Sequence, residues 1–186
     1  MIHLGRGVVV KFNTLTDIEC KSLIAICEDK RSNRLVNNRS NPKNTYQPGT
    51  SFTDVKLLFD NAPNLQKFIH NKICNAVEEY CTFQKIPFLG VNYEPPELMH
   101  FSVGQDKFHT HFDGNGKDCS RVLALVWYLN DVKEGGELHL PSSSEYLFIK
   151  PEKGKLAIIP TDWTHYHHVT TPVSNDRFSL ITFIRL

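Results

Sequence analysis

A histidine and an aspartate near the middle of the chain have the types and the spacing of metal ligands. In the segment 108–113, with the sequence FHTHFD, one residue separates His111 from Asp113. Side chains two residues apart in a β-strand lie on the same face, so an imidazole nitrogen and a carboxylate oxygen can reach one ion. His109 would share that face. By itself the tripeptide is a weak signal, because His-x-Asp often occurs by chance.

A second group of histidines lies far downstream. His165, His167 and His168 fall within four residues, and one of them could supply a third ligand from a distant strand. Two histidines and one carboxylate leave coordination positions open, as in non-haem Fe(II) oxygenases, which bind a bidentate cosubstrate and O₂. The same ligand types would suit a zinc hydrolase with a metal-bound water. The histidines could also be exposed on an edge strand, and residue types alone leave all three interpretations open.

Arg177 is a candidate anchor for a carboxylate. A turn around 174–176 would bring the chain back on an antiparallel strand near the histidines. Alternation places Arg177 and Ser179 together on one face of a strand whose two faces are mainly apolar. A buried guanidinium can bind a carboxylate through two parallel hydrogen bonds, whereas a surface arginine at a strand entrance would have no such role. A metal site beside a carboxylate anchor would suit a 2-oxo acid.

The elements that must position these residues differ between the two halves of the chain. In the first half, Val8–Val10 indicates a strand, and a capping box over Thr16–Glu19 predicts a helix that ends near Glu28. Apolar residues at helical spacing predict a second helix from about Pro63 to Phe83. The residues 31–53 are rich in Asn, Arg, Ser, Pro and Gly, and they predict a long loop that is either a lid over a site or disordered.

The second half is a succession of short β segments separated by turn signals. Strands are expected at about 97–103, 107–113, 121–129, 136–140, 145–149, 155–160, 165–171 and 177–185. The segment Arg121–Leu129 is almost continuously apolar, as expected for a strand that is buried on both faces. The pattern therefore predicts helices packed on a β core. With 186 residues, we expect one domain, with a helical support over about 1–95 and the β core over about 96–186.

Composition narrows the possible partners and the location. A formal net charge of +1 provides no basic field for nucleic acid or a membrane surface. No apolar run approaches the roughly 20 residues of a membrane-spanning helix. The five cysteines are an odd number without a Cys-x-x-Cys pair, which indicates reduced thiols and a cytoplasmic location.

From about residue 98 to its end, the chain resembles the catalytic core of prolyl 4-hydroxylases, including the collagen, algal and hypoxia-inducible-factor types. The segments that carry the resemblance are, in order, Gly104-Gln105, His111-Phe112-Asp113, Arg121 with Tyr128-Leu129-Asn130, Glu134-Gly135-Gly136-Glu137, Leu140-Pro141, Lys153-Gly154, His168, Pro172 and Arg177. The resemblance implies a mainly β fold with flanking α-helices, built on a double-stranded β-helix core, also called a jelly roll or cupin-like barrel. It also implies Fe(II), 2-oxoglutarate and O₂ as the reactive groups, with ascorbate as a candidate reductant.

The resemblance implies a role for each matching residue. His111, Asp113 and His168 would bind iron, with His168 preferred to its neighbours because Pro172 and Arg177 follow it by four and nine residues, as the family spacing requires. Arg177 would bind the distal carboxylate of 2-oxoglutarate. The residues that would support it are Ser179, on the same face, and Tyr128, which matches a tyrosine that contacts the cosubstrate in some members.

Two phenylalanines depart from the family pattern. Phe101 and Phe108 stand where the family often has tyrosines, so the 2-oxoglutarate pocket must differ in its hydroxyl contacts. His109 and His165 match no family role, and solvent-exposed or supporting positions are both open to them.

The activity implied is hydroxylation of prolyl residues in a peptide or protein, with release of succinate and CO₂. The alternatives are a 2-oxoglutarate oxygenase that acts on a free amino acid or another small molecule, and a non-catalytic cupin-like metal-binding module. Nucleic-acid dealkylation is disfavoured, because that branch has Arg-x-Asn-x-Thr-x-Arg where this chain has Ser179, Ile181 and Phe183 after Arg177. We therefore expect neither nucleic acid nor a membrane as a partner, and the sequence predicts no oligomeric state.

Overall fold

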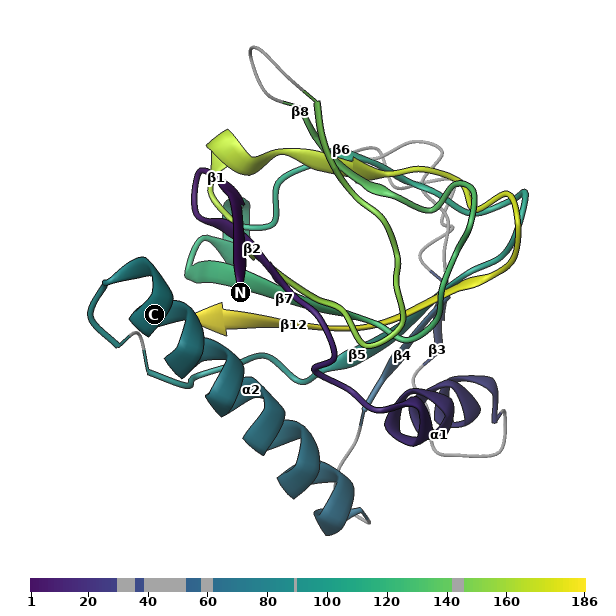
Figure 1. Ribbon diagram of the computed structural model, residues 1–186, viewed down its shortest axis with the longest axis horizontal. Coiled ribbons are helices and arrows are strands. Elements are labelled where there is room, and N and C mark those ends of the chain that lie inside the picture. Colours follow the sequence, from purple (N-terminus) through teal and green to yellow (C-terminus); the bar gives the residue numbers. More distant parts are fainter. Residues whose placement is uncertain (30–35, 39–52, 58–61, 89, 142–145) are drawn as a thin grey trace.

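Two antiparallel β-sheets face each other, and two helices lie on the outer side of the larger sheet (Figure 1). The computed structural model describes residues 1–29, 36–38, 53–57, 62–88, 90–141 and 146–186. The helices are α1 (Asp17–Glu28) and α2 (Pro63–Gln84), with short 3₁₀ helices η1 (Gly116–Asp118) and η2 (Trp163–His165). The strands are β1 (Ile2–Gly5), β2 (Val8–Lys11), β3 (Val36–Asn38), β4 (Thr53–Lys56), β5 (Glu97–Phe101), β6 (Phe108–His111), β7 (Arg121–Tyr128), β8 (Leu138–Pro141), β9 (Tyr146–Ile149), β10 (Leu156–Pro160), β11 (His167–Val169) and β12 (Arg177–Arg185).

The chain alternates between the two sheets. The major sheet has the strand order β1-β2-β10-β7-β12-β5-β4-β3, and the minor sheet has the order β6-β11-β8-β9. From β5 onward, each connection carries the chain from one sheet to the other, with the β8–β9 hairpin as the exception. This winding is that of a double-stranded β-helix, and the predicted fold class is confirmed. Strands from the amino-terminal half extend the major sheet at both edges.

Side-chain alternation along β7 divides the molecule into two apolar cores. Leu123, Leu125 and Trp127 point to the helical side, where they join the core formed with α1 and α2. Ala124 and Val126 point into the space between the sheets. Since β7 is buried on both faces, the almost continuous apolar run in the sequence has a direct structural cause.

The two helices hold the outer face of the major sheet in place. In α1, the Thr16 hydroxyl accepts from the Glu19 backbone N–H at 3.3 Å, and the Glu19 carboxylate accepts from the Thr16 N–H at 2.7 Å, which completes the predicted capping box. In α2, Ile69, Ile73 and Val77 are fully buried. Burial of each such side chain contributes about 1.5–3 kcal/mol, so packing on the sheet stabilises α2.

One predicted strand is shorter than expected, and one predicted loop lies mostly outside the described residues. The predicted strand over 165–171 is shorter, because the 3₁₀ helix η2 precedes it and β11 covers only His167–Val169. The predicted loop over 31–53 lies mostly outside the described residues, and so does its interpretation as a lid; within it, 36–38 and Thr53 belong to β3 and β4. Among the described residues, no helix is both long and apolar enough to cross a membrane.

Candidate metal centre and carboxylate pocket

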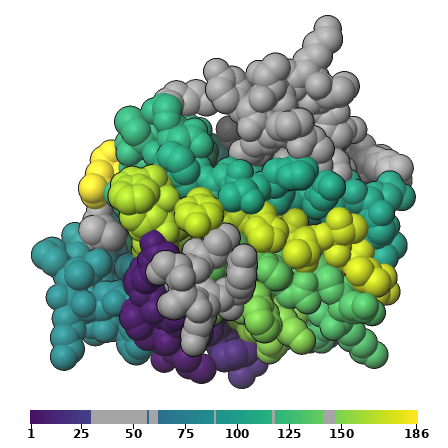
Figure 2. All heavy atoms as spheres, turned by 90° about the horizontal axis from the view of Figure 1, so that it is seen from above, coloured from purple at the N-terminus to yellow at the C-terminus, as the bar shows by residue number. Residues whose placement is uncertain are grey.

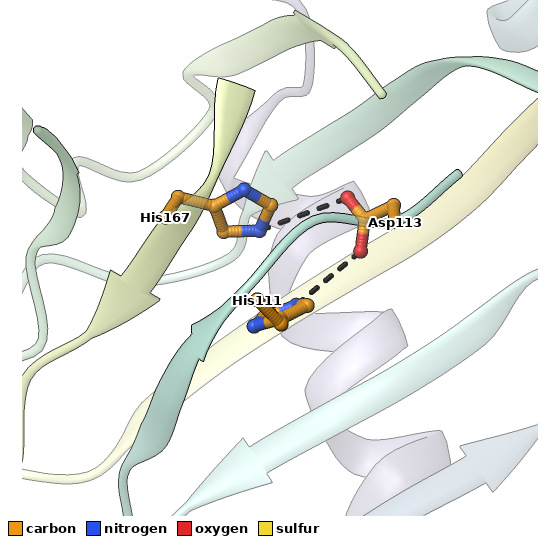
Figure 3. Close-up of side chains that lie close together, drawn as sticks. All are labelled: His111, Asp113 and His167. Carbon is orange, nitrogen blue, oxygen red and sulfur yellow. Dashed lines mark ion pairs between the residues drawn. The ribbon is translucent and has the colours of Figure 1, made fainter. Parts of the chain in front are cut away.

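Two neighbouring strands of the minor sheet bring three ligand-type side chains together. His111 at the end of β6 pairs directly with His167 at the start of β11, so the two imidazoles lie on the same face. Asp113 follows two residues after His111. Its Oδ1 lies 3.3 Å from His111 Nε2, and its Oδ2 lies 3.6 Å from His167 Nε2 (Figure 3). One ligand atom from each residue lies within 4.8 Å of the others, which is close enough for one metal ion.

Backbone carbonyls fix the orientation of both imidazoles. His111 Nδ1 lies 2.7 Å from the His109 carbonyl oxygen, and His167 Nδ1 lies 3.0 Å from the His165 carbonyl oxygen. A carbonyl only accepts, so each Nδ1 carries the hydrogen and donates it. Each Nε2 is then left with a lone pair directed toward Asp113, which is the tautomer that a metal requires.

The charges of the three groups also suit a metal. Burial alone would raise the pKa of Asp113, but His167, His111 and Arg121 outweigh this effect and lower it. Burial lowers the pKa of His167, although the Asp113 carboxylate opposes this. The carboxylate is therefore ionised and the His167 imidazole neutral, as metal binding requires. Two imidazoles and one carboxylate with open positions are a donor set that fits non-haem Fe(II).

The structure places His167, and not the predicted His168, at the third position. Because successive residues of a strand point to opposite faces, the inward direction of His167 turns His168 outward. His168 pairs with His139 of β8, and their ring centres are 4.9 Å apart. The sequence-based preference for His168 rested on its spacing to Pro172 and Arg177, whereas in the structure it is His167 that lies next to His111 and Asp113. The sequence contained one signal for His167. His167 and Val169 are two residues apart in a strand and therefore lie on the same face, and the apolar Val169 is buried between the sheets.

The segment that carries Asp113 is held by its backbone. Gly114 N–H donates to the Thr161 carbonyl oxygen at 2.8 Å, and a Cβ at position 114 would lie only 2.9 Å from that oxygen. Arg121 Nη1 donates to the Asp113 carbonyl at 3.3 Å, while its other nitrogens bind both carboxylate oxygens of Glu94 at 2.6 and 2.8 Å. Burial disfavours the charge of Arg121, but Glu94 outweighs it and raises the Arg121 pKa. A fixed ion pair thus positions the carboxylate ligand.

A cavity of about 940 Å³ between the sheets connects this centre with the predicted carboxylate anchor. His111, Asp113 and His167 line one part of the cavity, and Arg177 and Ser179 line another. The predicted metal ligands, with His167 in place of His168, therefore share one space with Arg177 and Ser179, whereas Tyr128 packs against Arg177 and is not among the lining residues.

Arg177 is the first residue of β12, and its side chain is buried, with only 2 % of the residue exposed. Its guanidinium centre lies 4.8 Å from the Phe101 ring centre and 5.2 Å from that of Tyr128, and Nη1 donates to Ser179 Oγ at 3.3 Å. Arg177 Nε and the Tyr128 hydroxyl are buried without a hydrogen-bond partner in the described part of the chain. Buried polar atoms are rarely left unpaired, so these two point to a ligand.

The charge of Arg177 points to an anionic ligand. Among the described residues no carboxylate pairs with the Arg177 guanidinium. The adjacent carboxylate, Asp176, binds other groups instead: His100 Nε2 at 2.7 Å and the Val103 N–H at 2.8 Å. Burial lowers the pKa of Arg177, and Tyr128 opposes this. Burial raises the pKa of Tyr128, and Arg177 opposes this, so the phenol remains protonated and can donate. A carboxylate would satisfy both unpaired atoms.

The other singled-out residues have structural surroundings. Phe101 packs against the Arg177 guanidinium, and the ring centre of Phe108 lies 3.9 Å from that of His111. Both phenylalanines therefore make ring contacts at the site, but neither offers a hydroxyl to a ligand. His165 is buried, with Nε2 at 2.6 Å from the Arg6 carbonyl, so it ties η2 to the β1–β2 turn. His109 supplies the carbonyl that orients His111.

Known proteins resemble the chain in sequence and in fold. Residues 98–185 match the sequence model of the 2OG-Fe(II) oxygenase superfamily. "Probable prolyl 4-hydroxylase 11" of Arabidopsis thaliana is 34% identical over 91 residues, which are 46% of this chain and 31% of that protein. The match thus spans about a third of that relative's length.

Three solved structures cover nearly the whole chain. A Pseudomonas putida prolyl-4-hydroxylase has a TM-score of 0.72 at 18% identity, covering 96% of this chain and 92% of its own. The 2OG complex of a viral collagen prolyl hydroxylase from Paramecium Bursaria Chlorella virus-1 has a TM-score of 0.69 at 21% identity, covering 97% and 96%. A Trichoplax adhaerens prolyl hydroxylase, in complex with a hypoxia inducible factor peptide fragment, has a TM-score of 0.75 at 15% identity, covering 96% and 83%. The predicted resemblance is confirmed, and at these identities the structures show the shared fold.

Proposed function

We propose that this chain, whose residues 98–185 match the 2OG-Fe(II) oxygenase superfamily, is an Fe(II)- and 2-oxoglutarate-dependent hydroxylase of prolyl residues in a peptide or protein. The observation that carries the proposal is the buried Arg177, which shares one cavity with His111, Asp113 and His167. A metal face with open positions beside a carboxylate anchor is the arrangement that a chelating 2-oxo acid requires.

Each residue has a defined task in the proposed reaction. His111, Asp113 and His167 would hold Fe(II), and their carbonyl-fixed tautomers keep Nε2 available. Arg177 and the Tyr128 hydroxyl would bind the distal carboxylate of 2-oxoglutarate, and Ser179 fixes the guanidinium. When bound, Fe(II) with O₂ and 2-oxoglutarate supplies the oxidising chemistry that converts a C–H bond to C–OH, with succinate and CO₂ as co-products.

The substrate part of the proposal is supported by the relatives. The Arabidopsis relative is named a prolyl 4-hydroxylase, and the Trichoplax structure contains a peptide. The cavity of about 940 Å³ also has room beyond a small dicarboxylic acid, which leaves space for part of a peptide.

The test is turnover of 2-oxoglutarate by metal-free protein that is resupplied with Fe(II), ascorbate and O₂. Short proline-containing peptides, the same peptides with alanine for proline, and free amino acids are compared. We expect succinate formation and a mass gain of one oxygen with the proline peptides alone. Turnover with free amino acids alone would favour the small-molecule alternative. The proposal would be contradicted if 2-oxoglutarate were not turned over with Fe(II), or if the peptides were hydrolysed with Zn²⁺.

A cytoplasmic location is part of the proposal. All five cysteines lie in the described part of the chain, and each is a free thiol. Free thiols are typical of reducing compartments. Fractionation of the native cells, with the protein detected by antibody, tests this location, and recovery in a secreted or organellar fraction would contradict it.

A further inference from the structure

A row of aromatic side chains crosses the outer face of the minor sheet, away from the cavity. His168 of β11 pairs directly with His139 of β8, and His139 pairs directly with Phe148 of β9. The neighbours Leu138, Val169 and Ile149 are buried between the sheets, so alternation turns this row toward the outside. Figure 2 looks onto this side of the molecule, with β6 in teal, β11 in yellow-green and β8 in green.

The two imidazoles lie close together, and one nitrogen of His168 is buried without a partner in the described part of the chain. Their ring centres are 4.9 Å apart, with an angle of 31° between the ring planes. Neither ring forms a hydrogen bond within the described ranges, and His168 Nδ1 is buried without a partner. The Phe148 ring, 5.9 Å from His139, packs on the other side of the pair. A buried polar nitrogen without a partner is unfavourable, so an additional bond at this atom would be favourable.

Two opposed imidazoles on a rigid sheet are a favourable arrangement for a metal ion. Zn–N bonds of about 2 Å let one ion join two nitrogens that are about 3–4 Å apart, within reach of side chains directly opposite each other in an antiparallel pair. Imidazole suits Zn²⁺, Cu²⁺ and Ni²⁺, whereas Mg²⁺ and Ca²⁺ prefer oxygen. We propose that His139 and His168 form a second metal site, for an imidazole-preferring divalent transition-metal ion, on the outer face of the minor sheet.

The second site is separate from the triad, although both use β11. His167 points into the cavity and His168 points away from it, so the two ions would lie on opposite faces of one strand. The outer ion would cross-link β11 to β8. It does not depend on 2-oxoglutarate or on turnover, so the outer site can be tested whether or not the proposed function holds.

The experiment uses a background variant in which the inner site is removed by His111→Ala with Asp113→Ala. His3→Ala is included in the background, because an amino-terminal Xaa-Xaa-His sequence binds Cu²⁺ tightly by itself. Cu²⁺ binding is measured by calorimetry, and the bound ion is examined by electron paramagnetic resonance. We expect a bound ion whose spectrum shows two imidazole nitrogens. Replacement of His139 by Phe, which keeps an aromatic ring beside Phe148, should weaken binding at least about tenfold, the scale found even for loss of an outer-shell partner.

A variant that changes the row but keeps both imidazoles serves as the control. Phe148 is exposed beside His139 and carries no ligand atom, so Phe148→Leu should leave the two-nitrogen spectrum unchanged. Equal affinities in His139→Phe and Phe148→Leu, or a spectrum with one nitrogen, would overturn the proposal. If the background variant does not fold, the same pair of substitutions is made in the full chain, where His139→Phe should lower the bound Zn²⁺ by one ion per chain and Phe148→Leu should not.

Discussion

His167 lies directly opposite His111 in the ladder between β11 and β6, and both imidazoles point into the space between the sheets. Pairing of two strands fixes which residues share a face, so the register decides the ligand set. A shift of one residue would place His168 inside and would turn His167 to the outer face of the minor sheet. Substitution of His167 and of His168 in separate variants therefore tests which of the two adjacent histidines binds the metal.

His167→Ala should abolish the binding of Fe(II) with 2-oxoglutarate, and His168→Ala should preserve it. Loss of His167 removes a ligand, whereas His168 lies on the other face of β11 and does not line the cavity. The measurement is the visible charge-transfer band of the Fe(II)–2-oxoglutarate chelate under anaerobic conditions. The opposite result, a band lost in His168→Ala and kept in His167→Ala, would restore the register expected from the sequence.

Arg177→Lys should raise the KM for 2-oxoglutarate and change kcat much less. A lysine keeps the charge but cannot provide two parallel hydrogen bonds between the aromatic rings. A hydrogen bond to a charged group contributes about 1.5–3 kcal/mol, so KM should rise roughly 10- to 150-fold. Arg185→Lys, the same substitution at the other end of β12 and outside the cavity, is the control. Equal effects of the two substitutions on KM would argue against a specific anchor.

Tyr128→Phe should weaken 2-oxoglutarate binding without loss of stability. In the ligand-free protein the Tyr128 hydroxyl is buried and unpartnered within the described residues, so its removal should leave the free energy of unfolding unchanged or raise it by about 1–2 kcal/mol. Loss of one hydrogen bond to the ligand, about 0.5–1.5 kcal/mol, should raise KM about 2- to 10-fold. Urea unfolding and steady-state kinetics measure the two effects.

Tyr80→Phe provides the matched comparison for this prediction. Tyr80 is also buried, but its hydroxyl donates to the Gly7 carbonyl oxygen at 3.0 Å. Its removal should lower the free energy of unfolding by about 1 kcal/mol and leave KM unchanged. If Tyr128→Phe destabilised the free protein as much as Tyr80→Phe does, the hydroxyl of Tyr128 would have a partner within the protein.

Local patterns were sufficient to predict much of the fold. The capping box placed the start of α1 within one residue, because the N-cap contacts involve only four consecutive residues. The apolar run of β7 predicted burial on both faces, since each face contributes to its own core. The strands β1, β3 and β4 were not predicted. They are short, and they form through pairing of β1 with β2, of β4 with β5 and of β3 with β4, which their own sequences do not encode.

The site was predictable in kind but not to the residue. His111 and Asp113 are two residues apart, and the local alternation of one strand brings them together. The third position depends on how β11 pairs with β6, more than 50 residues away, and on the 3₁₀ helix that delays the strand until His167. Residue types cannot distinguish adjacent histidines when the phase of the strand is set by such a distant contact.

Asp17 should make the stability of the protein sensitive to acid. Its carboxylate pairs with Lys153 of the β core and with Lys21 at 2.7 Å, and these contacts, the hydrogen bond with Lys153 first, lower the pKa of Asp17 from 3.8 to about 2. Since the folded pKa is lowered, the stabilisation is fully present above the unfolded value and is lost as the pH falls from about 4 toward 2.

Asp17→Asn should therefore lower the urea midpoint at about pH 5 and have little effect at about pH 2, where the wild-type carboxylate is itself becoming protonated. Lys153→Met, which removes the partner that contributes most, should show the same pH dependence, and the double variant should add little to either change because the two residues form one interaction. If Asp17→Asn lowered the urea midpoint by the same amount at both pH values, the change would come from an effect of the substitution on the start of α1 and not from the ionised carboxylate. It would mean that the contact between the start of α1 and Lys153 does not stabilise the protein.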